Sequence, residues 1–416
     1  MRYRLATWLF FGVIAVNVMD RQMMAILAES IRLDLGLSDT QLGALAGPLF
    51  AVFYAVAGLP LAMLADRSDR VKVLGWTTAI AGVFAVIAGW ARGFATLAIT
   101  RAAVAIGDAG GPPAIWSLVS TYYPVEERAR RIGLIQIGAP TGAVLAFVLG
   151  GFIATRLGWQ WGFILIGVAG ILIGLAALFL VPEPRRDAAK HGERQAVSGE
   201  GWRTLLASPA FRWGLAGVSF AGGAMFAVGI WSPTVLQREY GWAAEQAGLG
   251  LGAGTAIAGF TGTYLGGWYA SRRRAAGDDG AEFTVPMLAL ALCVPLILVT
   301  AIVPSALVAV GLYGFASFFL LAWNAPSIAG FQAIASERTR ALAASLHVFS
   351  VNMFGLGLGP LLVGWFSTLL TPSMGDDGLS WALAGVAGAS CLGAALCFAR
   401  AAALQRTAPF ATAAAT

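Results

Sequence analysis

Long apolar runs alternate with short polar segments along almost the whole chain. Most runs hold 20 or more residues, about the number that an α-helix needs to cross a hydrocarbon core of about 30 Å. The pattern predicts an all-α polytopic membrane protein with twelve transmembrane helices, at residues 5–29, 42–65, 72–91, 95–122, 132–154, 159–181, 210–236, 246–270, 284–303, 306–335, 341–370 and 380–405.

The longest polar interval divides these helices into two groups of six. It runs from Pro182 to Pro209 and carries charges of both signs. We therefore expect an N-terminal six-helix bundle at 1–181, a cytoplasmic linker at 182–209 and a C-terminal six-helix bundle at 210–416.

The two predicted bundles share short sequence patterns. E-R-A-R at 127–130, before the fifth run, recurs as E-R-T-R at 337–340, before the eleventh. Internal repeats of this kind, arranged around a central binding site, are typical of secondary transporters. The sequence therefore predicts two pseudo-symmetric halves.

Composition and cysteine usage support a membrane protein. The chain of 416 residues is 58% hydrophobic and 12% charged, whereas soluble domains carry roughly 25% charged residues. The three cysteines lie inside apolar runs without paired spacing and without a nearby histidine, so we expect neither a disulfide framework nor a metal site, and no cofactor.

The basic residues predict the topology. With the N-terminus inside, the segments assigned to the cytoplasm hold 21 of the 27 lysines and arginines. The positive-inside rule then places both termini in the cytoplasm, and we expect a bacterial inner membrane (plasma membrane) protein. We read the net charge of +6 as this bias and not as nucleic-acid binding. The first run resembles a signal peptide, but Asn17 and Asp20 interrupt it, which favours an uncleaved first span.

Charged residues inside apolar runs indicate a polar pathway. Asp20 and Arg21 lie in the first run, and an ionised side chain at the centre of a membrane helix costs on the order of 3 kcal/mol. Arg101 in the fourth run lies at a similar predicted depth to Asp20, and Asp108 lies seven residues later on the same helix face. The three predict a ladder of acid, base and acid in the first half. We expect no buried acid in the second half.

Two interpretations of this ladder stay open. Asp20 and Asp108 would exchange protons with opposite sides while Arg101 changes partner, which would couple a proton to transport. Alternatively, Asp20 and Arg101 form a static pair that joins two helices. Arg21, about 100° away from Asp20 on its helix, would bind a substrate anion or a backbone carbonyl.

The second half offers aromatic and weakly polar groups instead of acids. The candidate substrate contacts are Asn17 and Arg21 in the first half and Trp231, Trp323, Asn324, His347 and Asn352 in the second. Each aromatic residue could equally pack or face lipid. His347 is the only histidine in a predicted span, and it would contact substrate or a proton, or else cap or pack a helix.

Several of these motifs resemble the major facilitator superfamily. The loop Asp66-Arg67-Ser68-Asp69-Arg70 is similar to its D-R-x-x-R signature between spans two and three. Asn17-x-x-Asp20-Arg21, the run around Arg101 and G-L-G-L-G-P at 355–360 resemble its bacterial spinster-like branch. In that branch, a glutamate is usual where this chain has Asp108.

The resemblance implies a gate and a hinge. Asp66, Arg67, Arg70, Glu127, Arg128 and Arg130 would form a cytoplasmic gate whose ion pairs break on inward opening, although they could also serve only as orientation charges. Gly138, Pro140 and Gly142 are similar to the superfamily's glycine-proline motif and would form a hinge, or simply pack closely. Pro112 and Pro113 would break the fourth helix.

The sequence therefore predicts a secondary active transporter, not an enzyme. Its substrate would be an amphiphilic or organic anion, lysolipid-like, moved by alternating access with proton coupling. A sugar-acid or other carboxylate proton symporter and a drug-efflux proton antiporter remain alternatives. We expect protons, a small-molecule or lipid-like substrate and the lipid bilayer as partners, no nucleic acid, and a monomer. The sequence shows no nucleophile and base at a recognisable spacing, which argues against a membrane enzyme. The linker is too short for an output domain, which argues against a sensor.

Overall fold

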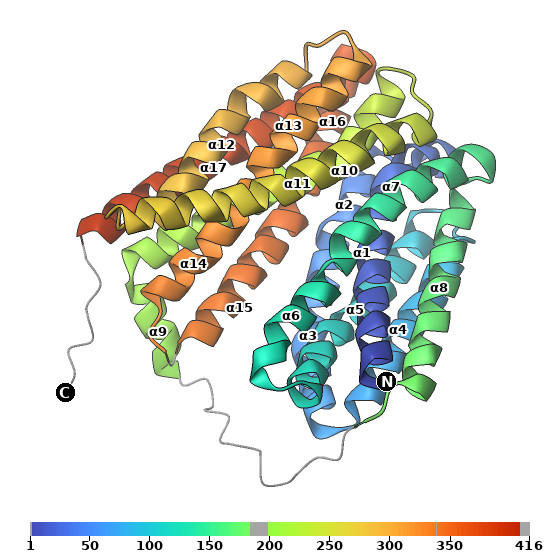
Figure 1. Cartoon of the computed structure of the whole chain (residues 1–416). Coiled ribbons are helices and arrows are strands. Elements are labelled where there is room, and N and C mark those ends of the chain that lie inside the picture. Colours follow the sequence, from blue (N-terminus) through green and yellow to red (C-terminus); the bar gives the residue numbers. More distant parts are fainter. Residues whose placement is uncertain (1, 184–198, 338, 408–416) are drawn as a thin grey trace, which may run out of the picture. The chain divides into compact units, whose positions relative to one another are not determined.

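Helices make up nearly all of the computed structural model, which describes residues 2–183, 199–337 and 339–407 (Figure 1). The described residues contain no strand. In sequence order, the first helices are α1 (Arg2–Leu35), α2 (Asp39–Ala46), α3 (Pro48–Arg67), α4 (Arg70–Ala88), α5 (Phe94–Tyr122), α6 (Val125–Gln136), α7 (Gly138–Arg156) and α8 (Trp159–Leu180).

The second part of the chain continues in the same way. Its elements are α9 (Gly199–Ala207), α10 (Pro209–Arg238), α11 (Ala244–Ala275), α12 (Ala281–Thr300), α13 (Ala306–Ala322), α14 (Asn324–Ile334), α15 (Arg340–Ser350), the π-helix η2 (Val351–Leu356), α16 (Gly357–Met374), the 3-10 turn η3 (Gly375–Asp377) and α17 (Gly378–Thr407).

These elements form the twelve predicted spans. Eight spans are single helices, namely α1, α4, α5, α8, α10, α11, α12 and α17, and four are helices in series, α2–α3, α6–α7, α13–α14 and α15–η2–α16. Nine described stretches are long and apolar enough to cross a membrane, and the last of them, Leu342–Thr407, contains two spans. α5 and α11 do not reach the required hydropathy, because α5 carries Arg101 and Asp108 and α11 is rich in glycine.

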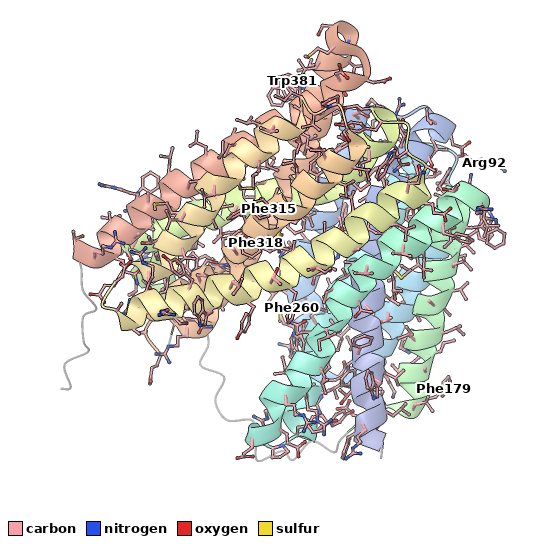
Figure 2. All side chains as sticks on the ribbon, turned by 45° about the horizontal axis from the view of Figure 1, so that its top comes forward. Arg92, Phe179, Phe260, Phe315, Phe318 and Trp381 are labelled. Carbon is pink, nitrogen blue, oxygen red and sulfur yellow. The ribbon has the colours of Figure 1, made fainter. Side chains whose placement is uncertain are left out.

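Many large apolar side chains face outward, as membrane spans require. Phe179 on α8 and Phe260 on α11 are 82% and 74% exposed, and their side chains project away from their helices (Figure 2). In water such surfaces would aggregate, whereas in a bilayer they contact lipid tails. The outward apolar surface therefore matches the predicted membrane environment.

The chain divides into two compact units. One comprises Met1–Lys190 and Ser232–Ala253, and the other comprises His191–Trp231 and Gly254–Thr416. The last residues of α10 and the first of α11 thus belong with the first unit. Part of the predicted linker, residues 184–198, lies outside the described residues, while α9 occupies 199–207 of the same interval.

Two local expectations are wrong. α5 is continuous through Pro112 and Pro113, because a membrane helix tolerates proline where neighbouring helices support it. The second half does hold a buried acid: Glu282, 9% exposed, lies in the first turn of α12 and pairs with Arg274 at 3.3 Å. An acid is favoured there by the positive end of the helix dipole.

Candidate functional site

A buried ion pair joins α1 and α5 in the first unit. Arg101 Nη1 donates to Asp20 Oδ2 at 2.6 Å, and both side chains are at most 5% exposed. The contact that the sequence spacing suggested is therefore present. Asp20 Oδ1 and Arg101 Nε are also buried but have no hydrogen-bond partner, so the pair satisfies only part of the hydrogen-bonding capacity of either group.

Asp108 shares a small cavity with Asp20. The cavity, of about 10 Å³, lies between α1, α4, α5 and α8, and its polar lining comes from Asn17, Asp20, Thr78 and Asp108. With its amide nitrogen turned toward α5, Asn17 donates to Asp108 Oδ1 at 3.2 Å. Asp108 Oδ2 is buried without a partner. The structure thus brings both acids of the predicted ladder together with Arg101 and Asn17.

Aromatic rings lie against the guanidinium groups of the two arginines of the site. The guanidinium carbon of Arg101 lies 5.5 Å from the ring centre of Phe50 and 5.9 Å from that of Phe163. Arg21 lies over the same Phe50 ring at 5.7 Å. Phe50 therefore attracts both cations without neutralising either. Sequence reasoning missed Phe50 and Phe163, since an apolar residue in an apolar run carries no signal.

Arg21 is half-buried, and the described contacts include no acid paired with it. A cation held by a ring face and left without a carboxylate keeps its capacity to bind an anion. The role of Arg21 in binding a substrate anion stays a prediction.

The predicted gate residues fall into separate contacts within the first unit. Arg70 is buried and donates to Glu183 at 2.8 and 3.0 Å, and to the hydroxyls of Ser117 and Thr121. Glu183 also accepts from the Val71 N–H at 3.1 Å. Glu183, just after α8, was not a candidate, because nothing in the sequence links it to a loop more than 100 residues earlier.

The other gate candidates have different surroundings. Arg128 donates to the carbonyls of Ser120 and Tyr123, which end α5, and so caps that helix. Glu127 pairs with Arg131 at 3.1 Å. Arg67 and Arg130 are exposed, and the side chain of Asp66 lies outside the described residues.

An unpredicted ion cluster ties the end of α10 to α1 and α2 inside the first unit. Arg238 binds Glu29 and Asp39, each at 2.8 Å, and Arg32 binds Glu29 at 2.6 Å. Arg238 and its two acids are at most 10% exposed at their side chains. Each of these charges has a partner of opposite sign, which offsets the free-energy cost of burying it.

The second-unit candidates are mostly buried. Trp231 donates to the Pro360 carbonyl at 3.0 Å, and Trp323 is fully buried with no partner for Nε1. The hydroxyl of Ser327 donates to the Asn324 carbonyl at 2.9 Å and lies 3.2 Å from His347 Nε2. Since that hydroxyl proton is already used, Nε2 of His347 donates to Ser327. His347 is thus held in a packed position, 4% exposed.

Asn352 lies in the π-helix η2, where its amide donates to the Val348 carbonyl at 2.9 Å. π-Helical turns inside longer helices are frequent at functional sites. Gly355 and Gly359, around the end of this turn, lie against Gly222 and Gly223 of α10 so closely that a Cβ would meet backbone at 2.8 and 2.5 Å. No sequence pattern located the π-helix itself.

The predicted hinge coincides with the junction of α6 and α7. Pro140 has no N–H to offer the Gln136 carbonyl, and α6 ends at Gln136. A Cβ on Gly138 would meet the Phe11 carbonyl at 2.5 Å, and one on Gly142 would clash with the Ala15 carbonyl. Close packing of α7 on α1 therefore explains why both positions hold glycine, independently of the predicted hinge role.

Comparisons with known proteins identify the family of this chain. A family model described as the Major Facilitator Superfamily matches residues 10–360. An "MFS-type efflux pump" of Mycolicibacterium smegmatis is 30% identical over 395 residues, which cover 94% of this chain and 91% of that protein. The "Sphingosine-1-phosphate transporter SPNS2" of Xenopus tropicalis is 24% identical over 381 residues, 86% of this chain and 72% of that protein.

A solved structure is similar over almost the whole chain. It is the crystal structure of a bacterial homolog to the human lysosomal transporter spinster, in an inward-facing and unoccupied conformation. The TM-score is 0.85 at 25% sequence identity, over 98% of this chain and 97% of that one.

Proposed function

This chain belongs to the Major Facilitator Superfamily of membrane transporters, and we propose that it moves a lysolipid-like amphiphilic anion across the membrane by alternating access, coupled to protons. Its resemblance to the spinster-like branch, seen in the sequence and in the solved structure, supports this substrate class. The observation that carries the proposal is the buried set of Asp20, Arg101, Asp108 and Asn17.

The uneven pairing of the two acids supports the proposal of proton coupling. Asp20 is paired with Arg101, whereas Asp108 has one buried oxygen without a partner. A nearby cation favours the ionised form of a carboxylate, and burial without one favours the protonated form. If Arg101 turns toward Asp108 during the cycle, the proton preferences of the two acids exchange, which couples proton movement to the change of access.

Arg21 and its surroundings support the proposed substrate class. Arg21 presents a positive charge on an aromatic face and forms no ion pair among the described contacts, which suits the head of an anion. The second unit contributes Trp231, Trp323, Asn324, His347 and Asn352 as candidate contacts, and of these Asn324 and Asn352 are the ones that are not buried. We propose that the polar head of the substrate binds Arg21 and Asn17 in the first unit.

Export of hydrophobic drugs is the second candidate, because the Mycolicibacterium smegmatis relative matches nearly its whole length and is named an efflux pump. Arg21, which has no ion pair among the described contacts, would repel a cationic drug, so this candidate favours neutral or anionic compounds. A sugar-acid symporter would use the same arginine but no apolar tail site.

We expect substrate-driven proton flux in liposomes holding the purified protein, and its loss in Asp20→Asn and in Asp108→Asn, because neither amide can carry a proton. Lysolipids, sugar acids, and hydrophobic anions and cations serve as the substrate panel. Asp376→Asn, an exposed acid on η3, is the matched control and should retain full flux.

The panel separates the three substrate classes in the same assay. Substrate movement without proton flux, unchanged in both variants, would make the buried set a structural clamp and the protein a facilitator.

A further inference from the structure

A cationic pocket lies at the start of α1, where its lining residues are about 14 Å (Phe11) to 24 Å (Arg4) along that helix from Asp20. Its volume is about 290 Å³, and it opens between α1 and α6 within the first unit. The lining residues are Arg4, Thr7, Trp8, Phe11, Arg130, Arg131 and Leu134. The positive-inside bias predicts this end of the bundle to be cytoplasmic. The pocket is therefore separate from the proposed transport site.

The pocket carries an excess of positive charge. Arg131 is paired with Glu127, but Arg4 and Arg130 are exposed, and no described acid lies within ion-pair distance of either. Three guanidinium groups around one hollow present many N–H donors in planar forks, the arrangement that recognises phosphate oxygens. The pocket is therefore complementary in charge to an anion that carries several oxygens.

The walls of the pocket are fixed by contacts inside the protein. The Tyr123 hydroxyl donates to the Tyr3 carbonyl at 2.7 Å, and Thr7 Oγ1 lies 2.7 Å from the same hydroxyl. The Arg131 guanidinium carbon lies 4.7 Å from the centre of the Tyr123 ring. These contacts join the start of α1 to the end of α5 and to α6, and they hold Thr7 and Arg131 in the wall of the pocket.

One side of the pocket is apolar. Trp8 is 61% exposed and packs edge-to-face with Phe11, their ring centres 5.8 Å apart, and Leu134 lies on α6. Tryptophan is enriched where membrane headgroups meet the hydrocarbon region. A free ion would use the arginines alone, whereas a lipid would use both sides of the pocket.

We propose that this pocket binds the phosphate headgroup of an anionic phospholipid from the adjacent leaflet. The arginines hold the phosphate, and Trp8 and Phe11 contact the start of the acyl chains. Basic pockets at the cytoplasmic ends of membrane helices bind such headgroups through the same chemistry. The proposal does not depend on what the transporter carries.

Binding is measured on the full-length protein in micelles by native mass spectrometry, with phosphatidylglycerol titrated against phosphatidylcholine. One phosphatidylglycerol should bind more tightly than phosphatidylcholine. Arg4→Gln and Arg130→Gln should each weaken that binding about fivefold, the effect of removing one basic residue near a charged headgroup. Neither substitution breaks an ion pair among the described residues, so folding should persist, which size-exclusion chromatography checks. Arg400→Gln, an exposed arginine on α17, is the matched control and should bind as the unaltered protein does.

Two further arms distinguish the source of the phosphate. Trp8→Ala should weaken phosphatidylglycerol binding, and inorganic phosphate should compete poorly. The proposal is overturned if the Arg4→Gln/Arg130→Gln double variant binds phosphatidylglycerol unchanged. It is also overturned if inorganic phosphate competes fully and Trp8→Ala has no effect, since the pocket would then be a simple anion site.

Discussion

At the scale of single residues, removing one member of the Asp20–Arg101 pair is expected to cost much free energy of folding. Both groups are buried in a helical bundle, and each has one further polar atom without a partner. Removing one member of such a pair leaves the other as an uncompensated buried charge, which is far worse than removing both.

We therefore expect Arg101→Gln to destabilise the protein by about 3–5 kcal/mol and the Asp20→Asn/Arg101→Gln double variant by less than the sum of the single variants. Thermal unfolding of the purified protein in micelles, read by tryptophan fluorescence, measures the effect. Arg92→Gln is the control, because Arg92 is exposed in the loop between α4 and α5 (Figure 2). Fully additive single effects would show that the two charges do not depend on each other.

The sequence predicted this pair because the depth of each residue in the membrane can be counted along its own helix. Seven residues separate Arg101 from Asp108 on one face of α5, and residue counting placed Asp20 at the height of Arg101. Phe50, Glu183 and the Arg238 cluster were not predictable, because each contact depends on which helices become neighbours. Glu183, for example, follows α8 and binds Arg70 at the start of α4.

At the scale of elements, apolar periodicity predicted the spans but not their internal breaks. The junction of α6 and α7 follows from Pro140, whereas the π-helix η2 and the continuous path of α5 through Pro112 and Pro113 depend on packing against other helices. Gly138 and Gly142 are the clearest case, because only their close packing against the backbone of α1 explains why a glycine is needed at each position.

Gly142→Ala should destabilise the protein by about 1–3 kcal/mol, because the added methyl group forces α7 away from the Ala15 carbonyl of α1. Gly133→Ala on α6 is a matched control, since a Cβ there meets nothing within 4 Å and alanine favours helix. Thermal unfolding in micelles compares the two variants. Equal midpoints for both would contradict close packing as the role of Gly142.

At the scale of the whole molecule, contacts between distant segments hold the ends of helices in each unit. In the second unit, Asp278 before α12 binds Arg406 at the end of α17 at 2.9 Å and Arg273 at 3.1 Å. Burial alone would raise the pKa of Asp278. The hydrogen bonds from Arg406 and from the Gly280 N–H, with the charges of Arg406 and Arg273, outweigh burial and hold that pKa below its ordinary value of 3.8.

A carboxylate with a lowered pKa stabilises the fold above its ordinary pKa, and this contribution is lost as the pH falls through the folded-state value. Asp278→Asn should therefore lower the unfolding temperature at pH 7, and the difference from the unaltered protein should shrink as the pH falls below about 4. Unfolding temperatures from pH 7 to pH 3 measure this, with Asp376→Asn as the control. A difference that stays constant with pH would rule out an electrostatic contribution from Asp278.

The position of Ser232–Ala253 also bears on how the protein is made. The first unit includes this segment, although the second unit begins before it in the chain. When Lys190 leaves the ribosome, the first bundle still lacks the Arg238 contacts that tie α10 to α1 and α2. At about 5–20 residues per second, Arg238 follows on the order of 2–10 s later. During that interval the partly inserted bundle carries Glu29 and Asp39 without their shared cation, which makes it a candidate for recognition by membrane chaperones or proteases.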